Sequence, residues 1–269
     1  MTGPGGSGVA PGRRLRILLA EDNPVNERVA RTLLEKQGHT VLVAHDGREA
    51  LAMAEREQLD VILMDVQMPE MDGFAATAAI REMEAGTGRR VPIVGVTAHA
   101  TPRDRRLCLA AGMDTYLSKP IRPGMLFAAI DEVIPGRERA PAAPPPADRS
   151  LAAVEVLDEA GLLAVVSGHR DLLRELAELF LEDSPQRLLE IRKALDSGNL
   201  AALQRAAHTL KGSASSLCGK RAAELALRLE ELADTRDLPA ARLSYSALAD
   251  EVGKLQRALV LLAGMNDSR

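Results

Sequence analysis

The sequence predicts an α/β domain built on a doubly wound, five-stranded parallel sheet, followed by an all-α domain built as an antiparallel helical bundle. In the first half of the 269 residues, five short apolar runs alternate with amphipathic segments, which is the pattern of βα units. The second half shows helical periodicity and no strand pattern. Between the two lies a proline-rich stretch, PGRERAPAAPPPADRS, which offers no large apolar side chain to a core.

The five apolar runs are nearly continuous, as expected for strands that are covered on both faces. They are LRILLA (15–20), HTVLVA (39–44), DVILMD (60–65), PIVGVT (92–97) and DTYLSK (114–119). Amphipathic helices are expected at 24–37, 47–58, 73–84, 101–111 and 122–133. Asn23 followed by Pro24 predicts the start of the first helix, and Gly38 predicts its end. Five such units give a parallel sheet with right-handed crossovers.

The second half is predicted to be helical throughout. Its helices are expected at 156–166, 169–183, 185–196, 200–217, 220–234 and 239–263. Breaks are expected at Gly168, Ser184–Pro185, 196–198 and 237–239. The last helix carries an apolar stripe made by Leu248, Val252, Leu255, Leu259 and Leu262. Such a stripe is typical of a helix in a bundle, and we expect four main helices.

These patterns divide the chain into four parts. Residues 1–13 are rich in Gly and Pro and are predicted to be a disordered tether. Residues 14–134 are predicted to form the α/β domain, 135–150 the linker and 151–269 the helical bundle. At this length, two domains of ordinary size are expected.

Composition narrows the classes of function. The chain carries 34 basic and 38 acidic residues, a net charge of -4, and only 2% aromatic residues, so neither a basic stripe nor stacking rings are available for nucleic acid. Cys108 and Cys218 have no metal or redox spacing. No segment reads as a signal peptide or as the roughly 20 apolar residues that span a bilayer. A cytoplasmic protein without membrane insertion is therefore expected.

Polar side chains follow four of the predicted strands. Glu21 and Asp22 follow the first strand, Asp65 ends the third, Thr97 ends the fourth and Lys119 ends the fifth. Because the carboxyl ends of parallel strands meet at one edge of a sheet, we expect these side chains to converge. Three carboxylates repel one another unless a cation neutralises them, and hard oxygen ligands suit Mg²⁺.

A carboxylate beside bound Mg²⁺ can attack phosphorus and form an aspartyl phosphate. We therefore assign Asp65 as the nucleophile and Glu21 and Asp22 as metal ligands. Lys119 and Thr97 are assigned as groups that each hold one phosphoryl oxygen. A single acidic residue at a strand end is more often a solvated cap, but five matching residues make that explanation poor. The chain has 28 arginines and only six lysines, so a lysine here suggests that a compact ammonium is needed.

The motifs of the first half are similar to a known family. AEDNPVN (20–26), LMDVQMPEMDG (63–73), VTAHA (96–100) and YLSKPI (116–121) resemble the receiver domain of two-component response regulators, especially the receivers of hybrid sensor histidine kinases. The resemblance covers about residues 14–134 and implies that Asp65 is the phosphoacceptor. It further implies that Mg²⁺ is bound by Glu21, Asp22, Asp65 and the backbone carbonyl of Gln67.

The same resemblance implies roles for three residues at the other strand ends. Lys119 and Thr97 are expected to contact the phosphoryl group. Thr97 and Tyr116 are expected to act together as a switch that alters the surface carrying the fourth helix. These roles belong to the family, and the residues that match them are those in VTAHA and YLSKPI.

In the second half, His208 lies in the middle of the helical segment AAHTLKGSASSL (206–217). The apolar stripe of this helix consists of Leu203, Ala207, Leu210, Ala214 and Leu217, and a neighbouring polar face consists of Gln204, His208, Lys211, Gly212 and Ser215. His208 is therefore expected to project to solvent. Gly212 costs about 1 kcal/mol of helix stability relative to Ala, and its missing side chain leaves room for another protein to close over the imidazole.

A lone histidine on a helix surface usually has no special role. His208 is different because Lys211 lies one turn away and can offset phosphate charge, and because Gly212 has no other explanation. Ser215 continues the face that a partner would approach. The other four histidines, His39, His45, His99 and His169, have no such neighbours.

HTLKGSASSL resembles the phosphorylation-site helix of histidine phosphotransfer (Hpt) domains, and the helical pattern of about 151–265 agrees with that fold. The resemblance implies that His208 is phosphorylated and that Lys211 and Gly212 assist it. An upstream sensor histidine kinase and a downstream response regulator receiver are the implied partners. No Gly-rich phosphate loop is present, so no ATP-dependent kinase module is expected in this chain.

The combination predicts a phosphorelay intermediate in which Asp65 accepts a phosphoryl group and passes it through His208 to or from another receiver. The sixteen-residue linker spans roughly 20 Å as a coil and about 50 Å when extended, so transfer within one chain is possible. An alternative is a binding module in which phosphorylation of Asp65 controls docking without relay through His208. A third hypothesis, a flavodoxin-like cofactor enzyme, is weaker because three carboxylates repel a cofactor phosphate.

Overall fold

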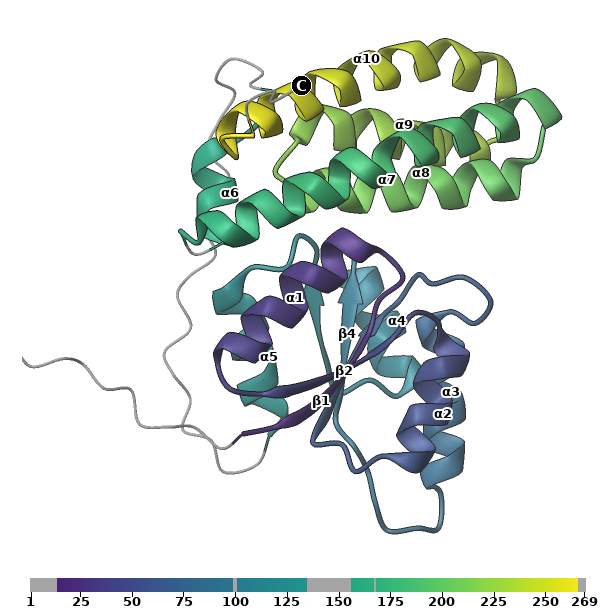
Figure 1. Cartoon of the computed structure of the whole chain (residues 1–269). Coiled ribbons are helices and arrows are strands. Elements are labelled where there is room, and N and C mark those ends of the chain that lie inside the picture. Colours follow the sequence, from purple (N-terminus) through teal and green to yellow (C-terminus); the bar gives the residue numbers. More distant parts are fainter. Residues whose placement is uncertain (1–13, 99–100, 135–155, 167, 266–269) are drawn as a thin grey trace, which may run out of the picture.

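The computed structural model describes residues 14–98, 101–134, 156–166 and 168–265. The predicted tether and the predicted linker lie outside the described residues. Within them, a five-stranded sheet with flanking helices is followed by a helical bundle (Figure 1). This is the α/β plus all-α architecture that the sequence predicts.

All five strands run parallel, in the order β2-β1-β3-β4-β5. Their bounds are β1 (Arg16–Ala20), β2 (Thr40–Ala44), β3 (Val61–Asp65), β4 (Ile93–Thr97) and β5 (Thr115–Ser118). The strand order reverses between β1 and β3. The segments that follow these two strands therefore lie side by side at the carboxyl edge of the sheet, where doubly wound folds bind ligands.

Side chains alternate along each strand, so the sheet supports two separate cores. From β1, Ile17 and Leu19 enter the core shared with α1 and α5, whereas Leu18 and Ala20 enter the core shared with α2, α3 and α4. Figure 1 shows these helices on the two sides of the sheet. Their bounds are α1 (Pro24–Lys36), α2 (Gly47–Arg56), α3 (Gly73–Glu84), α4 (Pro102–Ala111) and α5 (Pro123–Val133).

The second part of the chain is a bundle of four long helices with one short helix before them. The bounds are α6 (Glu159–Val165), α7 (Arg170–Ser197), α8 (Leu200–Ser216), α9 (Lys220–Asp234) and α10 (Leu238–Leu262). Gly198, at φ 68°, ends α7, and Asn199 begins α8 by accepting a hydrogen bond from the backbone N–H of Ala202. Because glycine adopts positive φ at little cost, these two residues can reverse the chain.

The structure differs from the sequence prediction at Pro185. The predicted break at Ser184–Pro185 is wrong, because α7 continues through it from Arg170 to Ser197. Pro185 is exposed, whereas Phe180 and Ser184 before it and Ile191 after it are buried in the bundle. The Ser184 hydroxyl donates to the Phe180 carbonyl at 2.5 Å and accepts from Gln256 of α10 at 2.9 Å. Tertiary packing thus outweighs the roughly 3 kcal/mol cost of proline inside a helix.

The bundle docks onto the α/β domain through α1. Helix α1 contacts both α7 and α8, and Figure 1 shows the bundle above α1, with α7 on the side that faces it. One cluster of buried apolar side chains includes residues of the α1 and α5 face and residues of the bundle core. The two domains therefore share buried surface in this arrangement.

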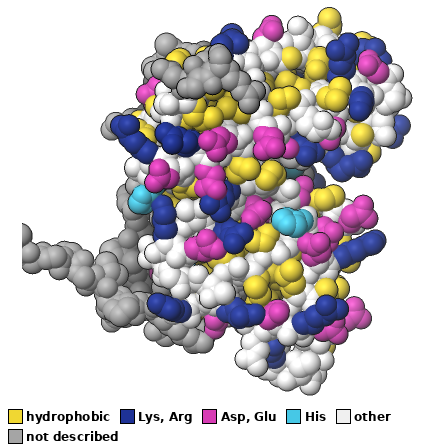
Figure 2. All heavy atoms as spheres, in the orientation of Figure 1, with side chains coloured by type: hydrophobic (Ala, Val, Ile, Leu, Met, Phe, Trp, Pro, Cys, Tyr) yellow, Lys and Arg dark blue, Asp and Glu magenta, His cyan; other side chains and the backbone are white. Residues whose placement is uncertain are grey.

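The outer surface is of mixed charge. On the face shown in Figure 2, acidic and basic side chains are interspersed rather than gathered by sign. None of the helices in the described part of the chain combines the length and the apolar character needed to cross a lipid bilayer.

Candidate functional site

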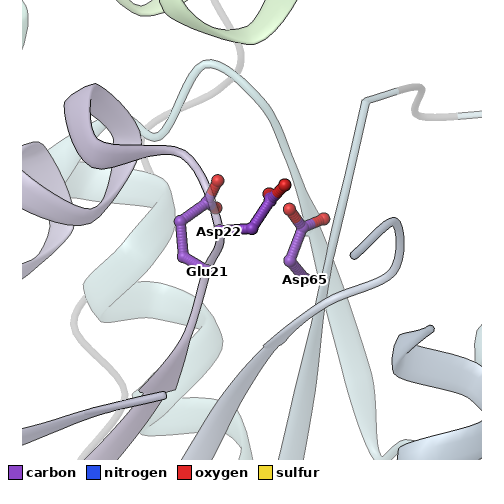
Figure 3. Close-up of side chains that lie close together, drawn as sticks. All are labelled: Glu21, Asp22 and Asp65. Atoms are coloured by element: carbon purple, nitrogen blue, oxygen red, sulfur yellow. The ribbon is translucent and has the colours of Figure 1, made fainter. Parts of the chain in front are cut away.

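Three carboxylates converge where β1 and β3 end. The two strands pair with Ala20 opposite Met64, so Glu21 and Asp65, the next residues along, come side by side. Oxygen atoms of Glu21, Asp22 and Asp65 lie within 4.8 Å of one another, and Figure 3 shows the three side chains gathered at this edge of the sheet. Glu21 and Asp65 are buried and Asp22 is partly exposed.

The ammonium group of Lys119 lies within this cluster. Its Nζ is 2.6 Å from Oδ2 of Asp65 and 2.8 Å from Oε2 of Glu21, and the lysine side chain is only 8% exposed. Lys119 follows β5, and its backbone N–H donates to the carbonyl of Thr97 at 2.7 Å. Thr97 is the buried last residue of β4, which pairs with β3 next to Asp65. The described fold thus brings all five predicted residues to one sheet edge.

Two further predicted residues lie near the same edge. The backbone N–H of Gln67 donates to Oδ1 of Asp65 at 3.2 Å, which places the Gln67 backbone beside the carboxylates. Tyr116 lies on β5, opposite Gly95, and packs partly buried against the core of α2, α3 and α4. The metal contact of the Gln67 carbonyl and the coupling of Tyr116 with Thr97 stay predictions.

Burial and mutual repulsion control the protonation of the cluster. Burial, and then the charge of Asp65, raise the pKa of Glu21 to about 8, although Lys119 acts in the opposite direction. The same two causes raise the pKa of Asp22 to about 6. For Lys119, burial lowers the pKa, but the charges of Asp65 and Glu21 outweigh it and raise the pKa above its usual value. The carboxylates are therefore short of positive charge, even with Lys119 among them.

This donor set fits a hard divalent cation. Its ligands are carboxylate oxygens gathered within 4.8 Å, and Mg²⁺ prefers oxygen ligands while keeping several waters. The raised pKa values of Glu21 and Asp22 have the sign expected where a cation would be stabilising. The residues present therefore suit Mg²⁺.

The second candidate centre is His208 on α8. Its Nδ1 lies 2.6 Å from Oε1 of Glu230 on α9, and the other oxygen of Glu230 lies 2.5 Å from Nζ of Lys211. Burial alone would raise the pKa of Glu230, but the hydrogen bond and charge of His208, with the charge of Lys211, lower it below the usual value. Glu230 is thus an ionised carboxylate that holds both groups.

The expectation that His208 projects to solvent is wrong. Its side chain is 15% exposed, and the Lys211 side chain is 9% exposed, because α9 supplies Glu230 beside them. Sequence reasoning missed Glu230. The available signal was its position four residues after Ala226 on the buried stripe of α9, where an acidic residue requires a partner.

Gly212 faces the α/β domain of the same chain. A Cβ atom at this position would lie 3.2 Å from Nδ2 of Asn26 and 3.4 Å from Nδ2 of Asn23, both on or next to α1. The missing side chain thus permits close approach, and within this chain the approaching surface is α1. Ser215 is partly buried, and its carbonyl accepts from the backbone N–H of Cys218 at 3.0 Å.

Polar contacts join the two domains. Nδ2 of Asn23 donates to the carbonyl of Thr209 and to Oγ of Ser213, both at 2.8 Å. Nearby, Arg28 of α1 donates to Glu175 of α7 at 2.7 Å. Sequence reasoning assigned Asn23 only as a helix cap and gave Arg28 no role. No local pattern could have revealed these contacts, because their partners lie more than 140 positions away.

A pocket of about 730 Å³ lies between the domains, with residues of both in its lining. The α/β domain contributes Asp22 and Gln67, and the bundle contributes His208 and Glu230. His208 is close enough to Asp22 for its charge to lower the pKa of that carboxyl against the effect of burial. Asp22 of the carboxylate cluster and His208 of the bundle thus line the same pocket.

Comparison with known proteins assigns both domains. Residues 17–131 match the family described as response regulator receiver domain, and residues 175–258 match the Hpt domain. Sensor histidine kinase GacS of Pseudomonas protegens is 36% identical over 216 residues, covering 77% of this chain and 23% of that protein. RpfC, a sensory/regulatory protein of Xanthomonas campestris pv. campestris, is 30% identical over 245 residues, covering 89% of this chain and 33% of that protein.

Among solved structures, the receiver domain of sensor histidine kinase PA1611 from Pseudomonas aeruginosa is 44% identical, covering 44% of this chain and 96% of that chain, with a TM-score of 0.41. The chain spans a third or less of the length of the curated relatives named above. On the two family matches, the chain consists of a response regulator receiver domain followed by an Hpt domain, the components of a two-component phosphorelay.

Proposed function

We propose that this chain is a phosphorelay intermediate in which Asp65 and His208 exchange a phosphoryl group with one another. The observation that carries the proposal is the shared pocket: Asp22, in the same carboxylate cluster as Asp65, and His208 both line it. Glu21, Asp22, Asp65 and the Gln67 carbonyl bind Mg²⁺ in this proposal. Bound there, Mg²⁺ supplies positive charge to the phosphoryl oxygens.

Lys119 and Thr97 hold the phosphoryl group on the receiver side. Lys119 already lies 2.6 Å from Asp65, so its ammonium can move onto a phosphoryl oxygen when the carboxylate becomes an acyl phosphate. The buried hydroxyl of Thr97 at the neighbouring strand end can hold a second oxygen. Both contacts stabilise negative charge in a site with little access to water.

In the transfer step, the bond between phosphorus and the Asp65 oxygen breaks while a bond between phosphorus and Nε2 of His208 forms. The electron pair of the broken bond returns to the Asp65 carboxylate, and the lone pair of Nε2 makes the new bond. Glu230 supports this step because it accepts a hydrogen bond from Nδ1, which leaves the lone pair on Nε2. It also stabilises the positive charge that develops on the ring.

The same bonds exchange in reverse, so the chain can receive or deliver a phosphoryl group at either residue. An upstream sensor histidine kinase is the proposed donor to Asp65, and a separate response regulator receiver is the proposed partner of His208. In the docked arrangement, α8 faces the chain's own receiver. Exchange with another protein at His208 therefore requires the two domains to separate.

The test compares the intact chain with a mixture of Asp65→Asn and His208→Gln chains. A small phosphodonor labels Asp65, and alkali-stable phosphate reports phosphohistidine. We expect the intact chain to label His208 at a rate that does not change on dilution, and the mixture to slow in proportion to concentration. Equal rates at low concentration would exclude transfer within one chain. Labelling of Asp65 with no alkali-stable phosphate in either sample would favour the phosphorylation-gated binding module instead.

A further inference from the structure

A path of buried polar groups connects the Hpt domain to the carboxylates of the receiver. Oγ of Ser216 on α8 donates to Oδ1 of Asn26 at 2.6 Å, and Nδ2 of Asn26 donates to Oε1 of Glu21 at 2.9 Å. From Glu21 the path continues through the Lys119 ammonium to Asp65. Ser216, Asn26 and Glu21 are each 3% exposed or less.

The chemistry of the three groups allows one orientation of the Asn26 amide. The NH₂ group of Asn26 donates to Glu21, and this is the orientation that a carboxylate bound to a cation requires, because such a carboxylate can only accept hydrogen bonds. The carbonyl oxygen of Asn26 then faces Ser216, whose hydroxyl is the donor that satisfies it. Without that hydroxyl, a buried amide oxygen loses its partner, and the amide can turn away from Glu21.

We propose that Asn26 is a positioning residue through which Hpt docking and Mg²⁺ binding favour one another. The docked Hpt domain orients Asn26 through Ser216, and Asn26 in turn holds the Glu21 side chain in the position from which it can ligate the cation. The inference rests on the proposed function in one respect, namely that Glu21 is a metal ligand. Because coupling between two sites is reciprocal, Mg²⁺ tightens docking by the factor by which docking tightens Mg²⁺ binding.

The test measures the Kd for Mg²⁺ by isothermal titration calorimetry on the full chain. Ser216→Ala removes the contact to Asn26 without substituting any of the carboxylate residues. Ser213→Ala is the matched control, since it removes a hydrogen bond across the same interface, but from Asn23. Among the contacts described, Asn23 accepts from the backbone N–H of Asn26 and touches neither the side-chain amide of Asn26 nor Glu21. Both substitutions are small and lie on α8, so both chains are expected to fold.

We expect Ser216→Ala to raise the Kd for Mg²⁺ about threefold to tenfold, the value of one hydrogen bond, and Ser213→Ala to leave it within twofold of the original chain. Asn26→Ala should raise the Kd at least as much as Ser216→Ala does. Adding Ser216→Ala to Asn26→Ala should then change nothing further, because Ser216 acts through Asn26.

Four outcomes would overturn the inference. An unchanged Kd in Ser216→Ala, or equal increases in Ser216→Ala and Ser213→Ala, would show that Asn26 does not carry the coupling, while the metal site and relay would stand. Additive effects of Ser216→Ala and Asn26→Ala would show that the two residues act separately. If the original chain binds no Mg²⁺, the metal part of the proposed function fails together with this inference.

Discussion

Glu230 and His208 form a hydrogen-bonded pair between neighbouring helices, with Oε1 of the glutamate 2.6 Å from Nδ1 of the imidazole. The glutamate is 9% exposed and the histidine 15%, so water competes little for either group. A carboxylate at Nδ1 determines which ring nitrogen carries the proton. In this bundle, the reactivity of a residue on α8 therefore depends on α9.

Removing this carboxylate should slow phosphotransfer at His208. In Glu230→Ala, we expect the rate of alkali-stable labelling to fall about tenfold to hundredfold, as when other histidines lose an orienting partner. Glu230→Gln keeps an acceptor oxygen but carries no charge, so its labelling rate should lie between that of the original chain and that of Glu230→Ala. NMR of the ring nitrogens should show a changed tautomer ratio in Glu230→Ala.

The matched control for that experiment is Glu231→Ala, because Glu231 is the exposed neighbour of Glu230 on α9. Glu230→Ala also leaves the buried ammonium of Lys211 without its counter-charge, so the Hpt domain should unfold at a lower temperature. If Glu230→Ala and Glu231→Ala label His208 equally fast, Glu230 has no role in orienting the ring.

Gly212→Leu should separate the two domains. Even a Cβ atom there would lie 3.2 Å from Asn26, and the rest of a leucine side chain has no space against α1. The substitution should at the same time stabilise α8 by about 1 kcal/mol, since glycine is a poor helix former. Small-angle X-ray scattering should show a larger radius of gyration, and concentration-independent transfer to His208 should be lost.

Gly253→Leu on α10 is the control for Gly212→Leu, because a Cβ there meets only Arg257 at 3.6 Å, an ordinary contact. Its radius of gyration should match that of the original chain. A compact Gly212→Leu chain would contradict the docked arrangement.

The stability of the metal-free protein should fall as pH rises through the range of about 6 to 8. The pKa of Asp22 is raised to about 6 and that of Glu21 to about 8, so the folded state binds protons that the unfolded state releases near pH 4. Their contribution is fully present below about pH 4 and is then lost progressively, for Asp22 up to about pH 6 and for Glu21 up to about pH 8. The raised pKa of Lys119 does not change stability over this pH range, because the lysine stays protonated in both the folded and the unfolded state.

Melting temperatures in a chelating buffer at pH 6 and pH 8.5, with and without added Mg²⁺, check this expectation. Mg²⁺ should stabilise the protein more at the higher pH, because it competes with the proton on Glu21, and its affinity should rise about tenfold per pH unit below the pKa of about 8. Glu21→Gln should lose most of the slope between pH 6 and 8. A melting temperature that rises over this range in the metal-free protein would contradict the prediction.

Pro185→Ala should stabilise the Hpt domain. The helix already runs through this exposed position, so replacing proline by alanine removes a cost of about 3 kcal/mol in the folded state. Alanine also gives the unfolded chain more freedom, which reduces the gain in the free energy of unfolding by about 1 kcal/mol. Calorimetry should show a melting temperature higher by about 10 °C for a domain of this size. Gln186→Ala, at the next exposed position, should change it little, and a lower melting temperature for Pro185→Ala would show that the proline supports the helix.

Local patterns were sufficient for most of the fold. The five strands lie within the predicted apolar runs because a buried strand needs apolar side chains on both faces, and that need is visible in four to six consecutive residues. Pro185 shows the limit of this reasoning. A proline breaks a helix that stands alone, but here the two halves of α7 are held in line by contacts with other helices, which no window of sequence contains.

For the candidate site too, some contacts could be predicted from the sequence and others could not. The meeting of Glu21, Asp65 and Lys119 was predictable, because the ends of parallel strands meet wherever the sheet is built. The roles of these residues in binding Mg²⁺ and phosphate stay predictions. The pairing of His208 with Glu230 was not predictable, because it depends on the rotation of α9 against α8.

The sequence by itself determined the two domains, the order of their elements and the residues able to carry a phosphoryl group, because each follows from periodicity or from a short motif. Only the tertiary structure decided that α1 lies against α7 and α8, and that Asn23 and Asn26 meet Ser213 and Ser216. The physical reason is distance along the chain. The two domains dock through contacts between residues more than 140 positions apart. Such contacts produce no periodic pattern in the sequence of either segment.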